Sequence, residues 1–147
     1  MKQLRIEVRM IVEIMGAPKT HIEETMKMVV EKFGNEPGIK VLKNKTFDCK
    51  ELENGLFSTF SEIEFETNEL QKLSDICFEY MPSSVEILEP AGAEMDMAVL
   101  SDMFNDILAK LHRYDMLVKN FNAENRILKE KMEKMRKDNL ELMKKLQ

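Results

Sequence analysis

The sequence is poor in the residues that usually build catalytic and metal-binding sites. Its 147 residues include no Trp, two His and two Cys. His21 and His112 are far apart in the chain, and a zinc site needs three or four convergent ligands, so we expect no metal. Cys49 and Cys77 form no CxxC motif and show no cluster of basic residues of the kind that activates a thiolate. We therefore expect neither an enzyme nor a bound cofactor.

Long apolar runs and a strong net charge are also missing. No run approaches the roughly 18 apolar residues of a membrane span. The opening MKQLRIEVRM interleaves charged and apolar residues, so we expect no signal peptide. The net charge of −5 argues against general affinity for nucleic acid or anionic membranes. Because two free cysteines suit a reducing compartment, we expect a cytoplasmic protein with no nucleic-acid or membrane partner.

Patterns of strand and helix alternate over the first part of the chain. From Lys2 to Ile14 apolar and polar residues alternate, which predicts a half-buried strand. Helical spacing follows from Pro18, which suits a first helical turn, to Gly34, and Thr20 with Glu23 would form a capping box if the helix began slightly later. The apolar positions of this helix are Ile22, Met26, Val29, Val30 and Phe33.

The same alternation continues through residue 90. A second strand is expected over 39–49, and Glu53-Asn54-Gly55 is a hairpin signal. A third strand is expected over 56–66, where the apolar spacing slips between Phe57 and Phe60, so we expect a bulge or burial on both faces. Thr67 or Asn68 can cap a second helix. The apolar stripe of that helix is Leu70, Leu73, Ile76, Cys77, Tyr80 and Met81. A short fourth strand is expected over 85–88.

The element order is βαββαβ, which predicts an α+β fold. Two split βαβ units of this kind make a ferredoxin-like sandwich, with one antiparallel sheet and two helices on one face. Another α+β sandwich with the same elements paired differently remains open. We therefore expect a ferredoxin-like domain over residues 1–90, followed by a separate helical segment over 94–147.

Residues 94–147 contain neither Pro nor Gly and follow one heptad register. Its a positions are Met97, Phe104, Leu111, Val118, Asn125, Met132, Asn139 and Leu146, and its d positions are Leu100, Ile107, Tyr114, Phe121, Leu128, Met135 and Leu142. Thirteen of these fifteen residues are apolar or aromatic. Such a pattern predicts a long helix that self-associates through this seam as a left-handed coiled coil.

The heptad register changes character along its length. Met103, Leu108 and Leu117 widen the apolar stripe upstream of residue 122. Downstream we expect the stripe to narrow to a and d. There Asn125 and Asn139 favour a parallel homodimer, in which each Asn meets its counterpart.

Charge is also uneven along this segment. Residues 126–147 carry eight Lys or Arg and four Asp or Glu, a net charge of +4. Because the whole chain carries −5, residues 1–125 carry −9. In a parallel pair, Glu124 would face Lys129 of the second copy, which is attractive, whereas Lys131 would face Arg136, which is repulsive.

A possible ligand loop lies between the first strand and the first helix. Gly16, Pro18 and Thr20 occupy the position where small anions can meet a helix N-terminus. In position this loop resembles the ligand loop of ACT domains, which share the βαββαβ topology and bind amino acids at dimer interfaces. The likeness covers only Gly16 and Pro18, since the usual Pro-Gly dipeptide is missing.

Two nucleic-acid interpretations are disfavoured. RNA-recognition domains need exposed aromatic residues and basic neighbours on the central strands. Here the first strand has no aromatic, and Glu62, Glu64 and Glu66 follow the aromatics of the third. These three share a face with Arg5 and Arg9, so we expect ion pairs across strands and not acid–base chemistry. A bZIP factor needs a basic region, and residues 94–105 are acidic.

The whole arrangement, including the stretch YMPSSVEILEP at 80–90, resembles uncharacterised short archaeal proteins. That resemblance implies no activity. Taken together, the sequence predicts a non-enzymatic homodimeric interaction protein that is joined through a parallel coiled coil and docks an unidentified protein partner. The alternative is a ligand-sensing domain of the ACT type that binds a small anion or amino acid near residues 16–20.

Overall fold

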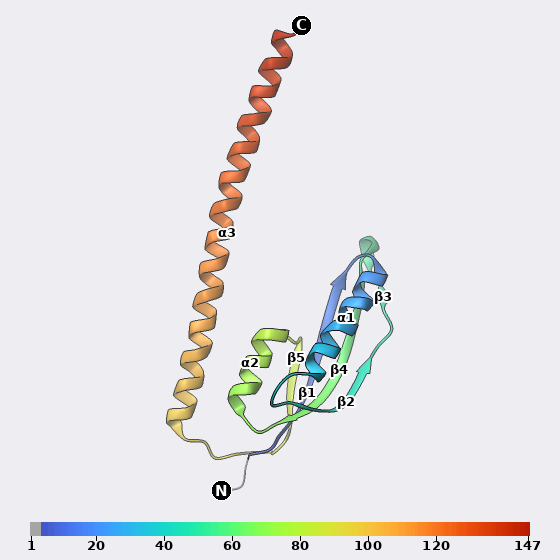
Figure 1. Ribbon diagram of the computed structural model, residues 1–147, viewed down its shortest axis with the longest axis vertical. Coiled ribbons are helices and arrows are strands. Elements are labelled where there is room, and N and C mark those ends of the chain that lie inside the picture. The colour runs from blue at the N-terminus through green and yellow to red at the C-terminus, as the bar shows by residue number, and fades with distance from the viewer. Residues whose placement is uncertain (1–3) are drawn as a thin grey trace. The chain divides into compact units, whose positions relative to one another are not determined.

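The computed structural model describes residues 4–147 and divides into two compact units, Met1–Asp96 and Met97–Gln147. In chain order the first unit contains β1 (Ile6–Gly16), α1 (Lys19–Gly34), β2 (Lys40–Thr46), β3 (Lys50–Glu51), the 3-10 turn η1 (Glu53–Gly55), β4 (Phe57–Thr67), α2 (Leu70–Tyr80) and β5 (Ser84–Glu89); the second contains α3 (Met97–Lys145) (Figure 1). The expected start of the first strand at Lys2 lies outside the described residues.

The strands of the first unit form one antiparallel sheet in the order β2-β4-β1-β5, and β3 pairs with β4. The two central strands, β1 and β4, pair along their whole length, from Ile6 opposite Thr67 to Gly16 opposite Phe57. With the two-residue β3 set aside, this order and the βαββαβ connection are those of a ferredoxin-like sheet. The predicted α+β fold followed by a long helix is confirmed.

The core lies between one face of the sheet and both short helices. Alternate residues of a strand point to the same face, so the period-two pattern in β1 and β4 buries one set of apolar side chains. Both short helices lie on one side of the sheet (Figure 1). The clustered buried residues are Ile6, Val8, Met10, Val12, Phe33, Ile63, Phe65, Leu73 and Ile76. Phe33, at the end of α1, makes edge-on ring contacts at 5.0 Å with Phe65 and at 5.1 Å with Tyr80. This one ring therefore joins both helices to the sheet.

The third predicted strand contains no bulge, and the second expected alternative, burial on both faces, is the one observed. β4 pairs with β1 without interruption, and the register shift lies in β2, between Val41 and Lys43. The apolar spacing slips because Phe60 lies on the outer face of the sheet, where its ring stacks on Phe47 at 4.3 Å. On the inner face the alternation continues through the buried hydroxyl residues Thr59 and Ser61.

The second predicted strand is shorter than expected. β2 ends at Thr46, and residues Lys50–Glu51 form the separate strand β3. The chain then turns at Asn54 and Gly55, whose φ angles are 63° and 71°, before it enters β4. These left-handed conformations suit Asn and Gly, so the predicted hairpin signal is confirmed.

α1 begins directly after Pro18, as the sequence predicts, and not at the later start that a capping box of Thr20 and Glu23 requires. Neither short helix has a side-chain cap. α2 follows Glu69, whose backbone N–H donates to Thr67 Oγ1 at 3.4 Å. Met81, predicted in the buried stripe of α2, is 74% exposed, because it follows the last helical residue in a left-handed conformation.

Candidate functional site

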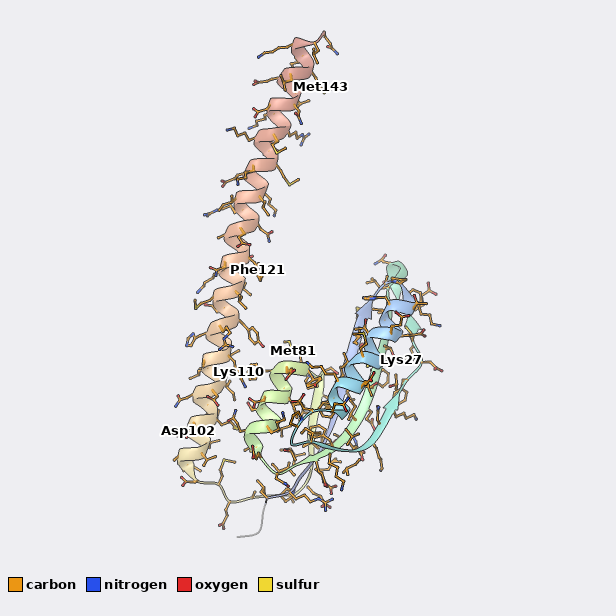
Figure 2. All side chains as sticks on the ribbon, viewed as in Figure 1. Lys27, Met81, Asp102, Lys110, Phe121 and Met143 are labelled. Atoms are coloured by element: carbon orange, nitrogen blue, oxygen red, sulfur yellow. The ribbon has the colours of Figure 1, made fainter. Side chains whose placement is uncertain are left out.

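The heptad seam is an apolar surface that the sequence predicts, and the structure places its positions on one continuous helix. All fifteen seam positions except Leu146 fall within α3. Among residues 4–147, α3 contributes no buried residue. Phe104, Phe121 and Leu128 are 54%, 60% and 56% exposed. Figure 2 shows side chains projecting all along the helix, Phe121 and Met143 among them.

The exposed apolar stripe of α3 is as long as the helix itself. At about 1.5 Å per residue, 49 residues extend on the order of 75 Å. Soluble proteins rarely leave a long contiguous apolar stripe open to water, and such a stripe marks an interaction site. The stripe is therefore a candidate interaction surface.

The downstream part of the stripe is wider than the a and d positions alone. Leu140 at b and Met143 at e are 50% and 63% exposed. They line a shallow hollow on α3 together with Met132, Met135, Arg136 and Asn139. The expected narrowing of the apolar stripe to a and d is therefore wrong: Leu140 and Met143 widen it near the end of α3, and Ile127 at c is also exposed.

The two seam asparagines stand out chemically. Asn125 and Asn139 are both exposed on α3. Each amide is therefore accessible from solvent. By contrast, the nearby charged pair Lys119 and Asp115 is satisfied within α3, at 2.6 Å between Nζ and Oδ2.

The outer face of the sheet carries the ion pairs that the sequence predicts. Arg9 of β1 donates to Glu64 of β4 from Nη2 at 2.8 Å and from Nε at 3.1 Å, and Arg5 reaches Glu66 at 2.6 Å. Hydrogen bonding from Arg9 holds the pKa of the Glu64 carboxyl below its ordinary value. A carboxyl held ionised in this way is a poor general acid, so the face is better suited to stabilising the sheet than to catalysis.

The predicted ligand loop has a structural explanation for its glycine. A Cβ placed on Gly16 would lie 3.0 Å from Ile22 Cδ1, so Gly16 allows α1 to pack closely on β1. The Ala17–Pro18 peptide bond is cis, and the Pro18 carbonyl accepts a hydrogen bond from the Ile22 N–H at 3.2 Å. Thr20 is exposed on the first turn of α1.

A recess of about 450 Å³ lies beside α1, but the predicted loop residues do not line it. Its lining consists of Glu23, Met26, Lys27, Thr46, Phe47, Asp48, Cys49 and Thr59. Thr59, at 2% exposure, is a buried hydroxyl among these residues and donates to the Phe47 carbonyl at 2.8 Å. The sequence predicted a ligand site in the loop before α1. The recess is instead lined by residues within α1 and by residues 46–49 and 59.

The remaining chemistry-bearing residues lie apart from one another. Cys77 is free, and burial raises the pKa of its thiol. Across residues 4–147, no three His, Cys, Asp or Glu side chains come together in a way that would hold a metal ion. In the same described range, no helix combines the length and apolarity required to cross a bilayer.

One polar cluster gave no signal in the sequence. Glu36, in the turn after α1, accepts hydrogen bonds from Lys72 at 2.5 Å and from Tyr80 at 2.8 Å. Hydrogen bonds from Lys72 and then Tyr80 hold the pKa of the Glu36 carboxyl below its ordinary value. Burial and the neighbouring carboxylate raise the pKa of Tyr80. The partners are distant in sequence, and no local spacing connects them.

Comparison with known proteins identifies a family but no activity. Among curated proteins, none matches the chain. One family model, named MJ0538 after an archaeal protein, matches residues 7–144 and so covers elements of both units. This agrees with the expected resemblance to archaeal proteins. The chain belongs to the MJ0538 family.

Proposed function

We propose that the protein is a non-enzymatic homodimeric scaffold in the cytoplasm. Two copies of α3 form a parallel coiled coil, and the dimer presents two α+β units and the coil itself to a protein partner. One observation carries the proposal: α3 is a 49-residue helix with a heptad seam and, among the described residues, no buried side chain.

The apolar seam supplies the driving force for this dimer. Its side chains are roughly half exposed, so covering each apolar position contributes about 1 kcal/mol. Exposed ion pairs at the flanks, such as Glu124 with Lys129 of the second copy, contribute only a few tenths of a kcal/mol each. The seam therefore decides whether two copies associate, and the flanking charges adjust the strength.

The positions of Asn125 and Asn139 favour the parallel arrangement. In a parallel pair, residues at a meet residues at a, so each amide can donate to the same amide of the other copy. In an antiparallel pair, residues at a meet residues at d, and every d residue is apolar or aromatic. Each buried amide would then lose its hydrogen bonds to water without replacement, which is costly.

Sedimentation equilibrium of the full chain at micromolar concentration tests the assembly. We expect the mass of two chains, and a monomer would contradict the proposal. Disulfide trapping tests the orientation. In a background with Cys49→Ser and Cys77→Ser, Leu142→Cys at d should form an intermolecular disulfide rapidly, since equivalent residues adjoin in a parallel seam.

Lys137→Cys provides the matched control, because position f points away from the seam. Equal trapping at positions 142 and 137 would indicate random collision. Trapping at neither position, in a protein that sediments as a dimer, would show that the chains are not parallel and in register.

A second candidate function is the sensing of a small ligand by the first unit, at the α1 end of the sheet. The observation that favours it is the recess beside α1, which combines an apolar side chain, Met26, with the charged groups of Lys27 and Asp48. Such a combination suits a small amino acid or anion. Thermal-shift measurements with amino acids and nucleotides test it, because a ligand of the folded state raises the melting temperature. Lys27→Ala should abolish the shift.

A further inference from the structure

The basic segment 129–137 of α3 has two faces with different charge balance. It contains five Lys or Arg and two Glu. On its outer face, Glu130 precedes Lys134 by four residues and Glu133 precedes Lys137 by four, a spacing that brings opposite charges together on a helix. These four residues and Lys129 line one shallow hollow. The outer face therefore largely neutralises itself.

On the seam side of the same segment, Glu133 precedes Arg136 by three residues, and only Lys131 lacks such a neighbour. Lys131 has no acidic residue three or four positions away, since its neighbours at that spacing are Ile127, Leu128, Lys134 and Met135. Arg136 lies in the other hollow, whose remaining lining residues are Met132, Met135, Asn139, Leu140 and Met143. The cationic group of Arg136 therefore adjoins exposed methionine and leucine side chains.

Dimerisation would concentrate these cations. In a parallel coil, Lys131 at g adjoins Arg136 at e of the second copy, and symmetry repeats the pair on the other side. The preceding pair, Glu124 with Lys129, is neutral. Asp138, at the next g position, lies one turn after Lys134 and faces Met143. Each groove of the coil therefore has one repulsive cationic pair beside an apolar strip of Leu140 and Met143.

We propose that this groove binds an acidic amphipathic helix of another protein. Apolar residues of that helix pack on Leu140 and Met143, and its carboxylates lie between Lys131 and Arg136 and relieve their repulsion. Methionine suits such a surface because its flexible side chain adapts to different partners. The inference rests on the parallel dimer proposed above and names the partner class for it.

The surface fits an acidic helix better than nucleic acid. Nucleic-acid backbones are held mainly by Lys and Arg along a continuous basic surface, whereas this groove is half apolar. Residues 1–125 also carry a net charge of −9 in each copy, which opposes the approach of a long polyanion.

Binding of a synthetic peptide to the full chain tests the inference. The probe is a fluorescent helix of about three heptads, with Leu along one stripe and Glu elsewhere. We expect saturable binding by fluorescence anisotropy. Polyglutamate of the same length should bind at least about tenfold more weakly, since it lacks the apolar stripe, and a duplex DNA of similar length should also bind more weakly.

Two double variants with the same change in net charge distinguish the contribution of the seam side to peptide binding from that of the outer face. Lys131→Glu with Arg136→Glu should weaken peptide binding at least about tenfold. This variant keeps a like-charged pair at the same place, so its dimer dissociation constant should equal that of the wild type. It should also bind a version of the probe in which Lys replaces Glu. Lys134→Glu with Lys137→Glu, on the outer face, should change peptide binding by no more than about twofold.

Several outcomes would overturn the inferred peptide site and leave the proposed homodimer of the free protein standing. Equal losses in both variants would show general charge attraction, and tighter binding of DNA than of the peptide would indicate a nucleic-acid surface. If the mixture sediments as one chain bound to one peptide, the peptide has replaced the second copy of α3 at the seam. A wild-type protein that sediments as a monomer would instead defeat the proposed dimer itself.

Discussion

Tyr80, the last residue of α2, donates a hydrogen bond to Glu36 in the turn after α1, with 2.8 Å between the two oxygens. The Tyr80 ring also packs edge-on against Phe33. One side chain thus connects the ends of both helices through a polar and an apolar contact. Lys72 completes the arrangement by holding the other oxygen of the Glu36 carboxylate.

Removing the Tyr80 hydroxyl should destabilise the first unit while leaving its core intact. Tyr80→Phe retains the ring against Phe33 but removes a donor to a carboxylate, so we expect a loss of about 1–3 kcal/mol in the free energy of unfolding. Urea denaturation measures it. In a double-variant cycle with Glu36→Gln, the two losses should not add, whereas additive losses would show that the hydrogen bond contributes nothing.

The Glu36 carboxyl should make stability depend on pH in the acid range. Its folded-state pKa lies below the ordinary value of 4.5, so the folded protein binds fewer protons there than the unfolded chain. The stabilisation is present above the unfolded pKa and is lost as the pH falls through the folded pKa. The difference in unfolding free energy between wild type and Glu36→Gln should therefore shrink from pH 7 to pH 3. Glu24→Gln, which alters an exposed carboxyl on α1, is the control, and a difference that stays constant would refute the role.

The central position of Phe33 predicts a large cavity effect. Phe33 is fully buried, so Phe33→Ala should cost about 3–5 kcal/mol in unfolding free energy. Met28, five residues earlier on α1, is 69% exposed, and Met28→Ala should leave stability nearly unchanged. Chemical denaturation compares the two. Similar losses would mean that α1 packs on the sheet through a different face.

Deleting the end of α3 should weaken dimerisation without unfolding the first unit. A chain that stops after Asn122 lacks the Asn-marked seam and keeps the wide upstream stripe. We expect a dimer dissociation constant at least about tenfold weaker by sedimentation, together with an unchanged strand signal by circular dichroism. A truncated chain that remains fully dimeric would move the principal interface to residues 97–121.

Replacing the seam asparagines should raise stability and reduce specificity. Asn125→Ile with Asn139→Ile substitutes apolar contacts for two amide layers, so the melting temperature should rise and species larger than a dimer should appear. Light scattering coupled to chromatography measures the species. Unchanged melting and mass would show that these amides are not buried between helices.

Much of the fold was readable from local patterns. Alternation located β1, helical spacing identified Ile22, Met26 and Phe33 as buried, and Asn54 with Gly55 marked the hairpin. The errors arose where a pattern was ambiguous. Phe60 matches either face of a strand, and only the position of Phe47 explains why it lies on the outer one. Met81 continues an apolar stripe whose helix has already ended.

The candidate sites also differ in how well local sequence patterns predicted them. The seam of α3 was predictable because a heptad repeat depends only on residues a few positions apart. The recess beside α1 was not, since it combines Lys27 of a helix with Cys49 and Thr59 of segments that meet only after the sheet forms. Gly16 was predicted as part of a ligand loop, and its close contact with Ile22 shows a packing reason for glycine there.

The sequence by itself determined the order of strands and helices, the core-facing side of β1 and the continuity of α3, because these depend on periodicity along the chain. Tertiary structure decided the strand neighbours, the outer position of Phe60 and the partners of Glu36. Those relationships depend on which residues meet across loops of different length, and no local spacing encodes them. The contact between Tyr80 and Glu36 belongs to this second group, since its partners come together only when both helices pack on the same face of the sheet.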